Sequence, residues 1–192
     1  FIGGLIGAPI WTRMAFRTGK HVALAISGVF YAVVIAAVYF LPAGNYPGAA
    51  VMMFLIGLPY SAGAFLLRAM MADIADEERL ASGVDRTGLL FAILSGTVKI
   101  GSALAIGITF VGLELIGFDA RTGGGDQGLV GLQVMFLVLP ILLSLLASWI
   151  ILSFPLTAER HAQIRAALAE RDSAEAPSSS DEETHAAVQT AE

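Results

Sequence analysis

The residue in this sequence that is most able to do chemistry is a lysine inside an apolar segment. Lys99 follows the start of the apolar run 88–117 by about 11 residues, which is roughly 16 Å of helix and close to the centre of a bilayer. An ammonium group at that depth costs about 2.5–3.5 kcal/mol. We therefore expect Lys99 to face a water-filled cavity, a carboxylate or a ligand, and to act in substrate binding or ion coupling. The alternative is a structural ion pair between two helices.

A hydroxyl group accompanies this lysine. Ser95 precedes Lys99 by four residues, and residues four apart share one face of a helix. We therefore predict that Ser95 contacts the same ligand. The alternative is a purely structural serine, because small residues let membrane helices approach closely.

Residues 72–87 form the most polar stretch before the C-terminal tail. Mixed charges between two apolar segments can pair with neighbouring loops and hold one conformation of a gate. The predicted gate residues are Asp73, Asp76, Arg79 and Arg86, with Arg13 and Arg17 opposite them. The alternative is a solvated loop, in which exposed ion pairs contribute only about 0–1 kcal/mol each.

Metal, thiol and hydrolytic chemistry are not predicted. The sequence has no cysteine, and its three histidines, His21, His161 and His185, are scattered without the spacing of metal ligands. The apolar segments contain no pair of carboxylates and no histidine. We therefore expect neither a cofactor nor an enzyme, and the absence of a basic stripe argues against a nucleic-acid partner.

The elements that must position these residues are membrane helices. Of the 192 residues, 56% are hydrophobic and only 14% are charged, with a mean hydropathy of +0.76, whereas about a quarter of the residues in soluble domains are charged. A bilayer core needs roughly 20 apolar residues of helix. The apolar segments are 1–10, which is half a span, then 22–41, 48–71, 88–117 and 130–154. The predicted fold class is all-α, a polytopic transmembrane helix bundle over residues 1–155.

Residues 156–192 are predicted to be a tail outside the bilayer. A short amphipathic helix is expected over residues 157–171. Disorder is expected after about residue 172, because the remainder is rich in Ala, Ser and Glu and cannot bury a core.

Lysine and arginine residues are concentrated on one side of the predicted bundle. That side holds Arg13, Arg17, Lys20, Arg68, Arg79, Arg86, Arg160, Arg165 and Arg171, and the other side holds Arg121. Because positively charged loops stay inside, the loops 11–21 and 72–87 and the tail are predicted to be cytoplasmic, in the inner (plasma) membrane.

Several short motifs resemble those of one transporter family. They are W-x-x-M-x-x-R-x-G-K at residues 11–20, the acidic stretch 72–78 followed by Gly83, Arg86 and Gly88, V-K-I-G-S-A at 98–103, Gly117-Phe118, and F-P-L-T-x-E-R at 154–160. Together they resemble the glycoside–pentoside–hexuronide:cation symporter family (melibiose permease-like) of the major facilitator superfamily. The resemblance covers most of residues 1–165.

The resemblance implies that the chain is the C-terminal part of a twelve-helix transporter, from the end of helix 8 to helix 12. It also implies that Lys99 takes part in substrate and cation handling between two halves. The ligands of the coupling cation would lie in the N-terminal half, which makes that missing half a partner. The apolar start at Phe1, without a methionine, leads us to expect such a fragment.

We therefore predict a secondary active transporter that couples a sodium ion or a proton to the symport of a sugar or glycoside by alternating access. The second acid of the motif is followed by Glu77, where the sugar permeases often have tyrosine. One alternative is therefore a symporter for a non-sugar solute such as a lipid or an organic anion. Another is a non-transporting membrane scaffold that displays its acidic tail to partners.

Overall fold

The computed structural model describes residues 1–42, 44–118, 125–153 and 158–175, and every regular element in these ranges is helical. The elements are α1 (Ile2–Thr18), α2 (Lys20–Val38), α3 (Tyr46–Ser82), α4 (Thr87–Leu115), α5 (Gly125–Gln133), the π-helical turn η1 (Val134–Val138), α6 (Leu139–Leu152) and α7 (Ala158–Glu175). The all-α prediction is confirmed. Four helical stretches are long and apolar enough to cross a membrane, namely 20–38, 46–82, 87–115 and 130–152.

The first helix is longer than the sequence predicted. The apolar segment 1–10 continues as α1 to Thr18, so most of the predicted loop 11–21 is helical. The chain turns only at Gly19, where φ is 96°, a conformation that residues with a side chain rarely adopt. The loop prediction followed the change from apolar to basic residues, and a helix can continue across such a change where no residue breaks it.

The same correction applies to the predicted loop 72–87. α3 is 37 residues long and extends beyond the apolar segment to Ser82, because alanine, glutamate and arginine are strong helix formers. It ends at Gly83, whose φ is 76° and whose N–H donates to the Arg79 carbonyl over 3.0 Å. Only residues 83–86 separate α3 from α4.

An aspartate in this turn accepts a hydrogen bond from the first residue of α4. The Thr87 N–H donates to the Asp85 carboxylate over 2.9 Å. Hydrogen bonds from the side chain and the backbone of Thr87 lower the pKa of the Asp85 carboxyl. An aspartate that accepts from the backbone two residues ahead is typical of a tight turn.

The last predicted span is built from three consecutive helical elements. α5 begins at Gly125, before the predicted start at residue 130, and runs through η1 into α6. In η1 the Leu139 N–H donates to the Val134 carbonyl, five residues back. The following residue, Pro140, has no N–H to continue the α-helical pattern. The predicted loop residues 119–124 lie outside the described residues.

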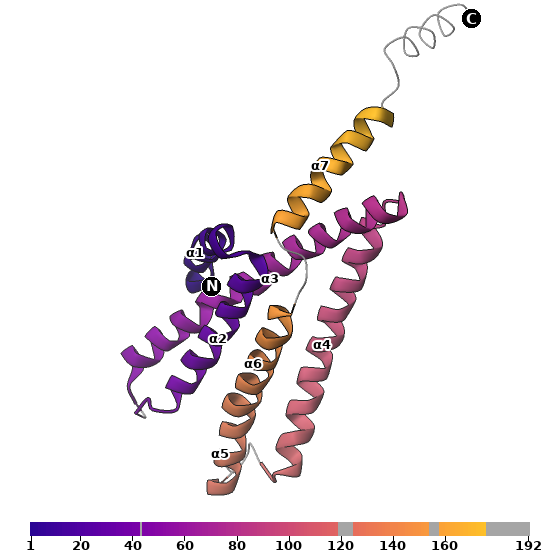
Figure 1. Cartoon of the computed structure of the whole chain (residues 1–192). Helices are drawn as coiled ribbons and strands as arrows, with labels where there is room; N and C mark the ends of the chain where they lie inside the picture. Colours follow the sequence, from indigo (N-terminus) through magenta and orange to yellow (C-terminus); the bar gives the residue numbers. More distant parts are fainter. Residues whose placement is uncertain (43, 119–124, 154–157, 176–192) are drawn as a thin grey trace, which may run out of the picture.

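Helices α1, α2 and α3 pack against one another, and α2 also packs against α6 (Figure 1). The buried residues of α1 are Gly3, Gly7 and Trp11, which share one helix face. A Cβ atom added at Gly7 would overlap the Leu58 carbonyl oxygen, so the backbones of α1 and α3 are in direct contact. Trp11 completes this contact because its indole N–H donates to the same carbonyl over 2.9 Å.

α4 and α7 lie at the edges of the bundle (Figure 1). None of the residues of α4 is buried within the described structure, so this span presents its side chains to whatever surrounds the bundle. α7 extends away from the spans and contacts the end of α3. The predicted amphipathic helix 157–171 is thus present, but it continues to Glu175. Residues 176–192 of the predicted disordered tail lie outside the described residues.

Candidate functional site

A cleft of about 600 Å³ lies between α3 and α4. Tyr60, Ala64 and Arg68 line it from α3, and Ser95 and Lys99 line it from α4. Within each helix these residues are spaced four apart, so each helix contributes one face. The structure therefore brings the two predicted binding residues, Ser95 and Lys99, into one cleft.

The Lys99 side chain is exposed in this cleft. It lies 12 residues after Thr87, or roughly 18 Å along α4. Within the described part of the chain Lys99 forms no ion pair. An ammonium group among apolar spans is costly unless water or an anion accompanies it. The cleft must therefore admit water or a ligand.

Ser95 differs from the other hydroxyl-bearing residues of α4. Thr97, Ser102 and Thr109 each donate to the carbonyl four residues back, over 2.8–2.9 Å. Ser95 makes no such bond and no other hydrogen bond to a described residue. Its hydroxyl group is therefore available to a ligand beside Lys99.

Tyr60 is a further lining residue that sequence reasoning missed. Its side chain is 75% exposed, and it lines the Lys99 cleft together with two neighbouring clefts. Tyrosines usually lie at the membrane interfaces, whereas Tyr60 lies 14 residues after the start of α3. A tyrosine well inside an apolar segment, directly after Pro59, is the sequence feature that could have identified Tyr60 as a lining residue.

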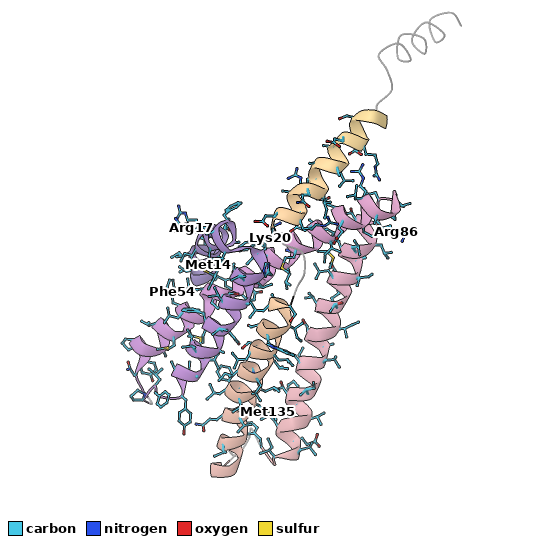
Figure 2. All side chains as sticks on the ribbon, viewed as in Figure 1. Met14, Arg17, Lys20, Phe54, Arg86 and Met135 are labelled. Atoms are coloured by element: carbon cyan, nitrogen blue, oxygen red, sulfur yellow. The ribbon has the colours of Figure 1, made fainter. Side chains whose placement is uncertain are left out.

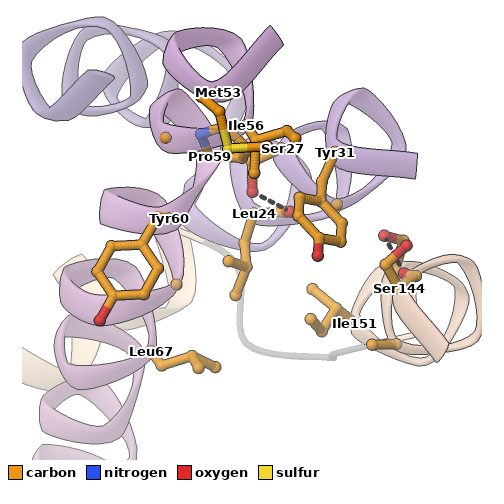
Figure 3. Close-up of a pocket in the computed structure, with 15 residues that line it drawn as sticks. Leu24, Ser27, Tyr31, Met53, Ile56, Pro59, Tyr60, Leu67, Ser144 and Ile151 are labelled. Carbon is orange, nitrogen blue, oxygen red and sulfur yellow. Dashed lines mark hydrogen bonds between the residues drawn. The ribbon is translucent and has the colours of Figure 1, made fainter. Parts of the chain in front are cut away.

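The cleft between α2, α3 and α6 has a different character (Figure 3). It measures about 530 Å³, and its serines bond to the backbone of their own helices. Ser27 donates to the Leu24 carbonyl over 2.7 Å, and Ser148 donates to the Ser144 carbonyl over 2.7 Å. This cleft contains no lysine, arginine or acid, so it offers a polar solute much less than the Lys99 cleft does.

The predicted gate acids lie at the charged end of α3. Asp73 is only 8% exposed, and both of its carboxylate oxygens accept hydrogen bonds from the Lys20 ammonium group, over 2.6 and 2.7 Å. A buried carboxylate requires a paired cation. Lys20, the first residue of α2, supplies it and so ties α2 to α3.

A histidine from the C-terminal helix joins the same acids. His161 Nε2 lies 3.0 Å from Asp76 Oδ2 and 3.3 Å from Asp73 Oδ1. Because a carboxylate only accepts hydrogen bonds, the Nε2 atom carries the hydrogen. From the sequence alone, His161 is an isolated residue of the tail. The feature that indicated a shared partner is the three-residue spacing of Asp73 and Asp76, which places both acids on one helix face.

The predicted gate arginines are not gathered around these acids. Arg86 pairs with Glu78 over 3.2 Å, and Arg79 pairs with Asp172 of α7 over 3.0 Å. Arg13 and Arg17 form no ion pair within the described residues. Figure 2 shows Arg17 and Arg86 at opposite ends of the charged side, with Lys20 between them. The cation beside Asp73 is thus Lys20, and the gate role of Arg13 and Arg17 stays a prediction.

The charged cluster is an ion-pair network. Among the described residues, no group of three or more His, Cys, Asp or Glu side chains is arranged to hold a metal ion. The arrangement joins the ends of α2, α3 and α7, and the Lys99 cleft lies on the membrane side of it, between α3 and α4. The two features are therefore separate: one joins the helix ends through ion pairs, and the other is a cleft that contains an ammonium group without an ion pair to a described residue.

A cleft with an unpaired ammonium group, set among helices that can cross a membrane, is an arrangement suited to moving a polar solute across it. A comparison with curated proteins found no match. The family model of MFS/sugar transport proteins matches residues 1–158, which include all four candidate spans. The chain therefore belongs to this family of the major facilitator superfamily and is a multi-pass membrane protein.

Proposed function

We propose that the protein couples the movement of a sodium ion or a proton to the transport of a sugar or glycoside, and that the Lys99 cleft is part of the substrate site. This proposal rests on one observation: the ammonium group of Lys99 and the free hydroxyl group of Ser95 line the same cleft. Sugar hydroxyl groups both donate and accept hydrogen bonds. Lys99 would donate to them, and Ser95 would donate or accept.

The coupling cation needs ligands that this cleft does not provide. Its lining contains no aspartate or glutamate, whereas Na⁺ and H⁺ are bound by oxygen atoms such as those of carboxylates. We infer that these ligands belong to further helices that face α3 and α4. The exposed face of α4, with no buried residue among those described, is where such helices would pack.

Transport would follow an alternating-access cycle in which two helix bundles rock about the substrate site. The charged ends of α1, α3 and α7 would lie in the cytoplasm, since they carry most of the lysine and arginine residues. We place the protein in the plasma membrane. The cytoplasmic gate would then consist of Asp73, Asp76, Arg79 and Arg86, with Arg13 and Arg17 on the neighbouring helix α1.

A second candidate substrate class is an anionic solute, such as an organic anion or a lipid with an acidic headgroup. Two cationic side chains, Arg68 and Lys99, line the same cleft, and charge-assisted hydrogen bonds to an anion are roughly twice as strong as neutral ones. A neutral sugar needs only one of these charges. The comparison of neutral and anionic sugars in one transport assay distinguishes the two classes.

The test is uptake by proteoliposomes under an imposed sodium or proton gradient, with Lys99→Ala. Losing a hydrogen bond to a charged group costs about 1.5–3 kcal/mol, so we expect transport efficiency to fall by about 10- to 100-fold. Thr97→Ala is the matched control, because the Thr97 hydroxyl group bonds to the Ile93 carbonyl and does not line the cleft. Unchanged uptake by the Lys99→Ala protein, at equal expression, would remove Lys99 from the site.

A further inference from the structure

The Lys99 cleft and the cleft between α2, α3 and α6 meet along one helix. Both are lined by Tyr60, Gly63 and Leu67 of α3. These residues are three and four positions apart, so they lie on one face of α3. The two clefts are therefore neighbours on a single helix face, with α4 beside the first and α2 and α6 beside the second.

Gly63 is the point at which the two clefts join. It has no side chain to separate them, and nothing lies within 4 Å of the position that a Cβ atom would take there. The neighbouring side chains of Tyr60 and Leu67 are 75% and 38% exposed, so they are not packed between the helices. A ligand in the Lys99 cleft can therefore extend past Gly63 into the second cleft.

The two clefts offer a ligand opposite kinds of surface. The Lys99 cleft contains an ammonium group and the free hydroxyl group of Ser95, and Arg68 also lines it. The second cleft is lined by no charged side chain, and its three serine hydroxyl groups donate to carbonyls of their own helices. Figure 3 shows apolar side chains such as Leu24 and Ile151 at its walls. The first cleft thus suits a polar group and the second an apolar one.

We propose that the two clefts form one site for an amphiphilic glycoside, with the sugar against Lys99 and Ser95 and its apolar substituent between α2, α3 and α6. This inference rests on the proposed function, because it takes the Lys99 cleft as the sugar site. The clefts measure about 600 and 530 Å³, and small-molecule sites span roughly 300–1,000 Å³. Such sites are mostly apolar, with a few polar groups that orient the ligand. The joined clefts have this composition.

The other apolar group available to the second cleft is an acyl chain of the bilayer. A lipid chain enters this cleft independently of any sugar at Lys99. A substituent of the substrate instead occupies both clefts at once, and the junction at Gly63 favours this occupant. Each methylene group that leaves water strengthens binding by about 4-fold. A butyl glycoside, with three more methylenes than the methyl glycoside, should therefore bind at least about 10-fold more tightly.

Protection of single cysteines tests this arrangement, because the sequence contains no cysteine of its own. V98C reports on the Lys99 cleft, and A147C reports on the second cleft, which Ala147 lines from α6. I150C is the matched control, because Ile150 is 57% exposed on α6 and lines neither cleft. The measurement is the rate at which N-ethylmaleimide labels the full chain in detergent. The probes are methyl and butyl glycosides of glucose, galactose, xylose and glucuronic acid.

For at least one of these sugars, we expect the butyl glycoside to slow the labelling of both V98C and A147C. The methyl glycoside should slow the labelling of V98C alone, at concentrations at least about 10-fold higher. Neither glycoside should protect I150C. Protection of V98C without protection of A147C by any butyl glycoside overturns the joined site and leaves the proposed function standing.

Two other results also overturn the joined site. Protection of A147C alone assigns the second cleft to apolar molecules such as bilayer lipid, independently of a sugar. If no glycoside protects either cysteine, the proposed sugar site fails, and the joined site fails with it.

A larger residue at the junction provides a second test. Gly63→Leu places a side chain between the clefts, in space that the structure leaves open. We expect the advantage of the butyl over the methyl glycoside at V98C to fall from at least about 10-fold to nearly none. Gly101→Leu is the control, because its surroundings are equally open and it lines neither cleft. An advantage that persists in Gly63→Leu, as in this control, overturns the junction at Gly63.

Discussion

Lys20 and Lys99 carry the same ammonium group in different surroundings. Lys20 is held by both oxygens of Asp73, so its charge is used in a structural ion pair. Lys99 has no partner within the described residues and lies beside the free hydroxyl group of Ser95. A ligand can bind only to a charge that the fold has not already paired, which is why, of these two lysines, we propose a substrate contact only for Lys99.

Tyr60 provides a prediction at the residue scale. Its ring lines the Lys99 cleft, and its hydroxyl group has no hydrogen-bond partner among the described residues. If the hydroxyl group bonds to the substrate, Tyr60→Phe removes one neutral hydrogen bond, worth about 0.5–1.5 kcal/mol. We expect the half-saturation concentration for uptake to rise by about 2- to 10-fold, and Tyr60→Ala to raise it further.

Concentration-dependent uptake in proteoliposomes measures this effect. Tyr46→Phe serves as the control, because Tyr46 is also highly exposed, at 82%, but begins α3 far from the cleft. Equal half-saturation concentrations for the wild-type, Tyr60→Phe and Tyr60→Ala proteins would show that Tyr60 does not contact the substrate.

At the scale of helices, small residues determine how closely α1 and α3 approach. Gly3 and Gly7 lie directly against the α3 backbone at Phe54, Gly57 and Leu58. Membrane helices associate through such close packing, because lipid provides no hydrophobic force between them. Trp11 then fixes their relative position with its hydrogen bond to the Leu58 carbonyl.

A larger residue at Gly7 should therefore separate the two helices. We expect Gly7→Leu to destabilise the protein by about 1–3 kcal/mol, the usual cost of overpacking, and to lower its melting temperature in detergent. Gly101→Leu is the matched control, since Gly101 is also helical but nothing lies within 4 Å of an added Cβ. A melting temperature for Gly7→Leu as high as that of the control would contradict the close packing.

At the scale of the whole molecule, the charged residues gather at one end of the helices. The ion pairs of Lys20, Arg79 and Arg86 all lie at this end, whereas the turn between α2 and α3 carries no charge. Positive charge is retained on the cytoplasmic side of membranes. The orientation of the protein should follow from this asymmetry.

Single cysteines test the orientation, because the sequence has none of its own. We expect P42C, in the exposed turn before α3, to react with an impermeant maleimide in intact cells. V84C, 51% exposed in the turn between α3 and α4, should react only after the cells are opened. The reverse pattern would place the ion pairs of Lys20, Arg79 and Arg86 on the outside.

Much of the architecture could be predicted because it depends on local sequence. A helix of about 20 apolar residues must satisfy its own backbone groups in lipid. Accordingly, most of each predicted segment, 22–41, 48–71, 88–117 and 130–154, lies in one helical stretch. Helix ends were predicted less well. α1 and α3 continue past their apolar segments until a glycine with positive φ, Gly19 or Gly83, ends them, since helix propensity does not stop where hydrophobicity does.

The sequence by itself determined that this is an all-α membrane protein, that it resembles transporters of the major facilitator superfamily, and that Lys99 and Ser95 share one helix face. Only the tertiary structure decided that Tyr60 shares their cleft, that Lys20 rather than Arg13 or Arg17 holds Asp73, and that His161 joins Asp73 and Asp76. Periodicity along a helix is a local property, but ion pairs between α2, α3 and α7 depend on how the helices pack. Residues 53 and 85 positions apart become neighbours only when the glycine contacts and buried side chains of those helices bring them together.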